Sequence, residues 1–124
     1  MKTETIDGAV FETWTPAELA AAFARDEVVV IDVRTPQEYM FEHIEGALLM
    51  PMAFFNANKL PGQSEKKIVF HCGSGVRSER VSRAAIAAGV THIAHLEGGF
   101  AAWKAEKLPY IGTNMATGAP QPVT

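Results

Sequence analysis

The segment that decides the fold is Ile68-Val69-Phe70-His71-Cys72-Gly73-Ser74-Gly75-Val76-Arg77-Ser78. Its first four residues form a largely apolar run that is typical of a buried strand. The two glycines predict a turn directly after the strand, and a helix is expected from about Arg77 to Ala88. A strand, a glycine-rich turn and a helix in immediate succession form an anion cradle at the carboxyl end of a parallel sheet. The segment therefore places Cys72 where ligand sites form in α/β proteins.

Strands and helices alternate along the rest of the chain. Two expected helices begin with a threonine N-cap, a proline at the first helical position and a glutamate that completes a capping box. These starts are Thr15-Pro16-Ala17-Glu18 and Thr35-Pro36-Gln37-Glu38. A further helix is expected from Gly99 to about Glu106, and a weak helical stretch from Met52 to Lys59. The predicted strands are residues 11–14, 28–33, 47–50, 68–71 and 92–96. This alternation predicts an α/β fold with a mostly parallel sheet.

The length of 124 residues leaves room for one domain. We place it at residues 1–111, with no pattern predicted for Met1 to Gly8. The segment 112–124 is rich in Gly, Pro, Thr and Ala, and we expect a flexible tail there. No apolar run approaches the roughly 20 residues that span a bilayer, so a cytoplasmic protein is expected.

A net charge of -3 argues against general affinity for nucleic acid or for an anionic membrane surface. The single cysteine excludes an internal disulfide, and no clustered Cys or His ligands predict a metal site. His92 and His95, three apart in a strand, lie on opposite faces and make a poor metal pair. We expect no cofactor.

Cys72 is the candidate nucleophile. Loop amides and the terminus of the following helix would lower the pKa of its thiol below the free value of about 8.5. Residues 66–83 carry five basic side chains against one acidic side chain, Glu79. This balance predicts positive charge around the loop and an anionic substrate. The alternative is a buried, inert cysteine in a glycine turn.

Three motifs, taken together, resemble the single-domain rhodanese family over roughly residues 11–111. The first is Ile31-Asp32-Val33-Arg34 with Glu38-Tyr39 and His43-Ile44-Glu45-Gly46-Ala47, the second is Cys72 to Ser78, and the third is Gly98-Gly99 with Trp103 and Leu108-Pro109. The resemblance implies an α/β/α sandwich around a five-stranded parallel sheet. It also implies a sulfurtransferase that carries sulfur as a persulfide on Cys72.

The expected substrates are an anionic donor, such as thiosulfate, mercaptopyruvate or a persulfide, and a thiophilic acceptor, such as cyanide, a thiol or a protein. The residues expected to bind substrate are Gly73, Ser74, Gly75, Val76, Arg77, Ser78 and Arg34. For Ser78 two roles stay open, a helix cap and a hydrogen bond to the sulfur. Arg34 is expected to line the pocket, while Asp32, Glu38 and His43 join it in a structural ion-pair network. His71 is expected to point away from Cys72, and Trp14 and Trp103 to pack in the core or at its rim.

Two alternatives follow from the same motifs. A catalytically idle rhodanese module that binds a protein partner would keep the fold without the reaction. The related phosphatases and arsenate reductases place five residues between cysteine and arginine, whereas Cys72 and Arg77 are separated by four. The shorter loop favours a sulfur atom over a tetrahedral oxyanion. Arg77 stands where mercaptopyruvate sulfurtransferases usually carry a small hydroxyl residue, which leaves the donor open, and Glu42 replaces a frequent glycine in a structural turn.

Overall fold

A six-stranded sheet in the order β1-β2-β6-β5-β3-β4 lies at the centre of the fold in the computed structural model, which describes residues 1–124. The strands are β1 (Lys2–Ile6), β2 (Ala9–Trp14), β3 (Val28–Asp32), β4 (Leu48–Leu49), β5 (Lys67–His71) and β6 (His92–Leu96). β2, β6, β5, β3 and β4 are parallel to one another, which confirms the predicted α/β fold with a mostly parallel sheet, although the sheet has one strand more than the five expected. β1 adds an antiparallel edge strand.

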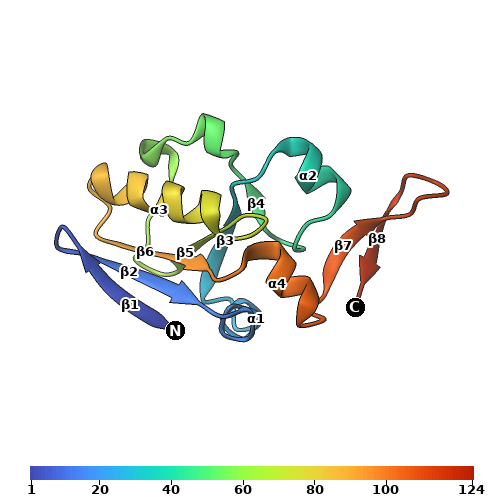
Figure 1. The fold of residues 1–124 in the computed structure, drawn as a ribbon, viewed down its shortest axis with the longest axis horizontal. Coiled ribbons are helices and arrows are strands. Elements are labelled where there is room, and N and C mark those ends of the chain that lie inside the picture. Colours follow the sequence, from blue (N-terminus) through green and yellow to red (C-terminus); the bar gives the residue numbers. More distant parts are fainter.

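Helices cover both faces of the sheet and complete an α/β/α sandwich. They are α1 (Pro16–Ala24), α2 (Pro36–Phe41), α3 (Val76–Ala87) and α4 (Gly99–Ala105), with 3₁₀ turns η1 (Met52–Phe54) and η2 (Ala57–Lys59). Figure 1 shows α3 on one face and α1 and α4 on the other. Each face buries its own core: Val81 and Ile86 of α3 pack over one, and Leu19 of α1 and Trp103 of α4 over the other. The sulfur-bearing Cys72 belongs to the core beneath α3.

Local sequence signals place the helix starts correctly. Thr15 and Thr35 are N-caps of α1 and α2, and both predicted capping boxes are formed in full. α2 has the predicted bounds, and the other helices and the central strands begin or end within about two residues of theirs, as expected for element ends. Trp14 and Trp103 are buried in the core, as predicted.

Two hairpin segments differ from the sequence predictions. β1 and β2 are joined by Asp7-Gly8, whose φ angles of 49° and 83° fit a two-residue hairpin turn, so the segment that was expected to have no pattern forms half of a hairpin. At the other end, β7 (Tyr110–Thr113) pairs with β8 (Pro120–Val123) as a separate two-stranded sheet. The structure thus has strands where only an irregular tail from Gly112 was expected, because pairing between two weak segments stabilises strands that composition alone does not reveal. The flexibility of residues 112–124 stays a prediction.

No helix combines the length and the apolar character that crossing a bilayer requires.

Candidate active site

The sulfur of Cys72 lies inside a ring of hydrogen-bond donors at the carboxyl end of β5. The amide of Gly75 donates to Sγ at 3.1 Å and the amide of Ser78 at 3.3 Å. Gly75 is the N-cap of α3, and its φ of 107° is a left-handed conformation that suits glycine. The turn thereby aims its amides at the sulfur, and Cys72 is fully buried.

The environment of Cys72 favours the thiolate. Burial alone would raise the pKa of the thiol, because it removes solvent from the charged form. Hydrogen bonds from the Ser78 amide and hydroxyl and from the amides of Gly75 and Ser74 outweigh burial, so the pKa of Cys72 lies below its ordinary value. A buried thiolate held by backbone amides can act as a nucleophile without an adjacent base.

The Gly98-Gly99 pair supports the cysteine loop from the opposite side. The amide of Phe100 donates to the Cys72 carbonyl at 2.8 Å, and that of Ala101 to the Gly73 carbonyl at 3.0 Å. A Cβ on Gly99 would lie 2.5 Å from the Cys72 carbonyl oxygen. Only glycine permits this close approach, which gives the motif quoted from the sequence a physical reason.

Arg77 is held by an acidic partner that the sequence analysis assigned to a different network. Its Nη1 donates to Glu38 Oε1 at 2.7 Å and its Nη2 to Glu38 Oε2 at 3.0 Å. The paired guanidinium lies against Gly73, since a Cβ built there would be 3.2 Å from Nη2. The hydrogen bonds from Arg77 lower the pKa of Glu38 to about 2. Arg77 thus crosses from the cysteine loop to α2.

The expected network around Asp32 is smaller than predicted. Asp32 binds the guanidinium of Arg34 through both carboxylate oxygens, at 2.8 to 3.1 Å, and both residues are buried. Arg34 also donates to the Glu42 carbonyl at 2.7 Å. Glu38, as shown, pairs with Arg77 instead, and Nδ1 of His43 lies 2.8 Å from the Tyr39 carbonyl oxygen. The network prediction was therefore wrong for these two residues, because tertiary packing supplies nearer partners.

His71 points away from the sulfur, as the strand alternation predicted. Its Nε2 lies 3.5 Å from Asp32 Oδ2 and has no hydrogen-bond partner, and its ring packs near Phe100 of α4. Burial lowers the pKa of His71, which favours a neutral ring.

The predicted concentration of positive charge around the loop is wrong in part. Lys66 and Lys67 lie at the amino end of β5, where they pair with Asp26 and Glu12. Arg83 pairs with Glu79 along α3. The sequence count overstated the positive charge near Cys72, because the length of β5 separates the two lysines from the loop. Arg77 is the basic residue of this group that contacts the loop.

Two hollows flank the Arg77–Glu38 pair. One has a volume of about 290 Å³ and is lined by Arg34, Glu38, Phe41, Glu42, Gly73, Phe100, Ala101 and Lys104. The other, of about 270 Å³, contains Arg77, Arg34 and the exposed Phe54 in its wall. Val76, the remaining loop residue, is exposed. Both hollows lie beside the cysteine loop, and the buried Cys72 is not among their lining residues.

Ser78 does not cap α3, since the N-cap is Gly75. Its hydroxyl instead accepts from the Cys72 thiol at 3.6 Å and lies 2.8 Å from Nδ1 of His95. From the sequence, His95 was expected only to make a poor metal pair with His92. No sequence signal connects it to Cys72, because β6 reaches the loop only through the strand order of the sheet. No group of three or more His, Cys, Asp or Glu side chains is placed to hold a metal ion.

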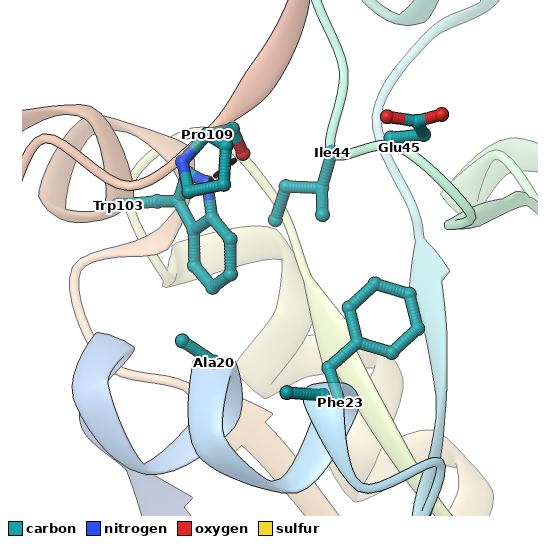
Figure 2. Close-up of a pocket in the computed structure, with 7 residues that line it drawn as sticks. Ala20, Phe23, Ile44, Glu45, Trp103 and Pro109 are labelled. Carbon is teal, nitrogen blue, oxygen red and sulfur yellow. Dashed lines mark hydrogen bonds between the residues drawn. The ribbon is translucent and has the colours of Figure 1, made fainter. Parts of the chain in front are cut away.

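A further hollow, of about 320 Å³, lies in the layer of α1 and α4 (Figure 2). Its lining residues are Ala20, Phe23, Ala24, Ile44, Glu45, Trp103 and Pro109. The indole of Trp103 donates to the Pro109 carbonyl at 2.9 Å, and the other lining residues are apolar except for Glu45. The hollow contains no nucleophile and lies in the layer opposite the core that holds Cys72.

Comparison with known proteins identifies the family. The model of the rhodanese-like domain matches residues 15–106, and the chain belongs to this family. An uncharacterized protein of Synechocystis sp. is 38% identical over 104 residues, which are 84% of this chain and 58% of that protein, so the chain spans less than two thirds of this relative. The thiosulfate sulfurtransferase GlpE of Coxiella burnetii is 33% identical over 79 residues, covering 64% of this chain and 74% of that protein.

The fold comparison agrees with the family. A rhodanese-related protein from Thermoplasma volcanium superposes with a TM-score of 0.69 at 25% identity, over 80% of this chain and 96% of that one. The chain is thus a rhodanese-like domain with relatives among the sulfurtransferases, a family whose reactions have a sulfur donor and a sulfur acceptor.

Proposed function

We propose that this protein is a sulfurtransferase that moves a sulfane sulfur from an anionic donor to a thiophilic acceptor through a persulfide on Cys72. The observation that carries the proposal is the ring of donors around the buried sulfur, with the amides of Gly75 and Ser78 at 3.1 and 3.3 Å. This ring stabilises a thiolate and suits a second sulfur atom that carries negative charge.

The reaction has two displacements. The Cys72 thiolate attacks the outer sulfur of thiosulfate, a new S–S bond forms, and the sulfur–sulfur bond of the donor breaks to release sulfite. The acceptor then attacks the outer persulfide sulfur: cyanide leaves as thiocyanate, and the thiolate is restored. No external oxidant or reductant is required. A cellular thiol or a protein thiol would accept the sulfur in the same way.

The backbone and the side chains of the loop have different roles in this reaction. Amides of residues 73 to 78 hold the sulfur, and Arg77, fixed by Glu38, presents its guanidinium beside Gly73 to the sulfonate or carboxylate end of the donor. Arg34 lines both hollows, but its guanidinium is occupied by Asp32. We therefore assign Arg34 to the wall of the pocket and Arg77 to recognition of the donor.

The test is intact mass spectrometry after incubation with thiosulfate or mercaptopyruvate. We expect the chain to gain about 32 Da, one sulfur atom, and to lose it with dithiothreitol or cyanide, because a persulfide is the intermediate. Cys72→Ser is the matched variant and should gain nothing, and sulfate, which has no sulfane sulfur, is the control ligand. Since Cys72 is the only cysteine, the mass assigns the site.

A folded wild-type chain that gains no mass with any sulfane donor would overturn the proposal in favour of an idle binding module. Hydrolysis of a chromogenic aryl phosphate that depends on Cys72 would overturn it in favour of a phosphatase.

A further inference from the structure

His95 has a place in the structure that the proposed reaction does not use. It lies near the end of β6, is only 5% exposed and stacks on Phe11, with ring centroids 5.1 Å apart and planes inclined by 27°. The ring is therefore fixed in orientation. Its Nδ1 faces the cysteine loop and meets the hydroxyl of Ser78 at 2.8 Å.

Ser78 connects this ring to the nucleophile. Its hydroxyl oxygen accepts from the Cys72 thiol at 3.6 Å, and its O–H has two possible acceptors, the Gly75 carbonyl at 3.2 Å and, nearer, Nδ1 of His95 at 2.8 Å. A hydroxyl has one proton to donate and two lone pairs that accept. It can therefore accept from the thiol while it donates to Nδ1, or accept from Nδ1–H while it donates to the thiolate. The two arrangements use the same three groups, with the direction of every hydrogen bond reversed.

The other nitrogen of the ring, Nε2, is left without a partner in the protein. Nε2 of His95 makes no hydrogen bond within the chain and, in contrast to Nε2 of His71, is not fully enclosed. His95 lines a polar hollow of about 290 Å³ at the back of the loop, formed with Ser74, Gly75 and residues of β1, β2 and α3. The charged groups that face it are Lys2 and Glu4 of β1, Glu79 and Arg83 of α3, and Glu97 after β6.

We infer that His95 is a positioning residue that acts through Ser78 to set the ionisation of Cys72 and to carry its proton to the hollow behind the loop. The inference rests on the proposed function, in which Cys72 must be a thiolate before it attacks a donor. The candidate donor site is lined by Arg77 and Gly73, neither of which lines the hollow beside His95, so the proton and the donor use separate hollows.

The proton transfer balances without a co-reactant other than water. In the thiol state the S–H donates to Ser78, whose O–H donates to Nδ1 of a neutral ring that carries its proton on Nε2. The thiol proton passes to Ser78 as the Ser78 proton passes to Nδ1, and the ring releases its Nε2 proton to water in the hollow. The thiolate then accepts from Ser78, which accepts from Nδ1–H. One proton leaves, and the ring changes tautomer.

A neutral ring suits this role because it can accept a proton at Nδ1. Burial, the largest influence, lowers the pKa of His95, and Arg83 acts in the same direction, while Glu79, Glu97 and Glu4 oppose them. The net lowering keeps the ring neutral near pH 7.

The first test uses wild-type protein without any donor. Nitrogen-15 NMR of the histidine rings distinguishes a protonated Nδ1 from a protonated Nε2, and alkylation of Cys72 by iodoacetamide measured against pH gives the thiol pKa. We expect the proton on His95 to move from Nε2 to Nδ1 as Cys72 loses its own, and no such change in Cys72→Ala. A ring that stays protonated on Nε2 across the titration of Cys72 would overturn the inference.

The second test uses variants at the same sites. His95→Phe keeps the stack on Phe11 and removes both nitrogens, and we expect the Cys72 pKa to rise by roughly 0.5 to 1 unit. His95→Asn places an amide near the position of Nδ1 and should restore most of the wild-type pKa. Ser78→Ala should raise it by about one unit, and adding His95→Phe should raise it no further, because both changes break one chain.

His92→Phe is the matched control, since His92 lies on the same strand and contacts Glu12 rather than the loop. It should leave the Cys72 pKa unchanged. Additive shifts in the double variant, or no rescue by His95→Asn, would reduce His95 to a packing residue.

These outcomes are separable from those of the proposed function. If the His95 tautomer changes but Cys72 gains no sulfur, the proton relay stands and the sulfurtransferase proposal fails. If Cys72 gains sulfur but the His95 tautomer does not change, the sulfurtransferase proposal stands and the relay fails.

Discussion

α1 and α2 begin with the same local pattern but differ in what their glutamates contact. In α1, the Glu18 carboxylate accepts from the Thr15 amide and meets the amino group of Met1 at 3.1 Å. In α2, Glu38 makes the same capping contact with Thr35 and also binds both Nη atoms of Arg77. The Glu18 capping box therefore ties α1 to the amino terminus, whereas the Glu38 capping box ties α2 to the cysteine loop.

The difference teaches that a local motif acquires a second role from its surroundings. The carboxylate of a capping glutamate can also bind a cation, and the fold determines which cation reaches it; for Glu18 it is the amino group of Met1. For Glu38 that cation is Arg77, 39 positions further along the chain, which follows Cys72 in the loop. The comparison can be tested by changing each member of the two pairs in turn.

The largest effect on sulfur loading is expected from Arg77→Ala, which removes the cation that pairs with the capping glutamate of α2. Loss of a charge-assisted hydrogen bond to the donor is worth about 1.5 to 3 kcal/mol, or roughly 10- to 150-fold in kcat/KM for sulfur loading. Arg77→Lys should recover only part, because a point charge does not reproduce a planar fork. Stopped-flow measurement of loading from thiosulfate would check it.

The control for this prediction is Arg80→Ala, since Arg80 is exposed on α3 and forms no ion pair. It should load at the wild-type rate. Discharge of the persulfide by cyanide should be less affected by Arg77→Ala, because cyanide needs no second anion site. Equal losses in both half-reactions would remove Arg77 from donor recognition.

These contacts show where sequence reasoning succeeds and where it stops. The capping boxes, the strand before Cys72 and the turn at Gly75 follow from residues adjacent in sequence, and each was predicted. The pairing of Glu38 with Arg77 and of Ser78 with His95 depends on strand order, which brings β6 and α2 beside the loop. The wrong prediction that Lys66 and Lys67 lie near the loop has the same origin, because residues that are close to Cys72 in sequence need not be close to it in space.

The next effect is on stability, and it should be similar for the two helices. Thr15→Ala and Thr35→Ala each remove an N-cap that accepts from the glutamate amide at 3.2 Å, at a cost of about 0.5 to 2 kcal/mol in the free energy of unfolding. Urea denaturation would measure it. Thr35→Ala should also slow sulfur loading, since it loosens the helix that presents Glu38. Slower loading in Thr15→Ala as well would show that helix stability, and not Glu38, controls the loop.

A smaller effect is expected from Glu38→Gln compared with Glu18→Gln. Glutamine still completes a capping box, so both helices keep their caps. Only Glu38→Gln loses the ion pair with Arg77, a partly exposed contact worth about 0.2 to 1 kcal/mol. If the whole of this free energy contributes to orienting the donor, the KM for the donor rises by roughly 1.4- to 5-fold in Glu38→Gln. Glu18→Gln should leave the KM unchanged. Steady-state kinetics would show it, and a lower KM in Glu38→Gln would mean that Glu38 competes with the donor for Arg77.

The smallest effect is the pH dependence of the Glu38–Arg77 pair, and its direction follows from the pKa. The folded pKa of Glu38 is about 2, against an ordinary value of 4.5, because Arg77 and Thr35 donate hydrogen bonds to the ionised form. Stabilisation by this carboxylate is therefore fully present above pH 4.5 and is lost as the pH falls towards 2. The Glu38 side chain is 37% exposed, so solvent and salt screen the pair and the gain stays small.

The measurement is the difference in free energy of unfolding between wild type and Glu38→Gln from pH 6 to pH 2. It should be constant down to about 4.5, shrink below that value and vanish near the folded pKa of about 2. Glu18, whose pKa also lies below its ordinary value through hydrogen bonds from Thr15 and the terminal amine, supplies the parallel difference with Glu18→Gln. Because Arg77 is absent from that capping box, the Glu18 difference should decline at a higher pH. Coincident declines would show that the two carboxylates are held alike and that the pairing with Arg77 adds nothing to the second capping box.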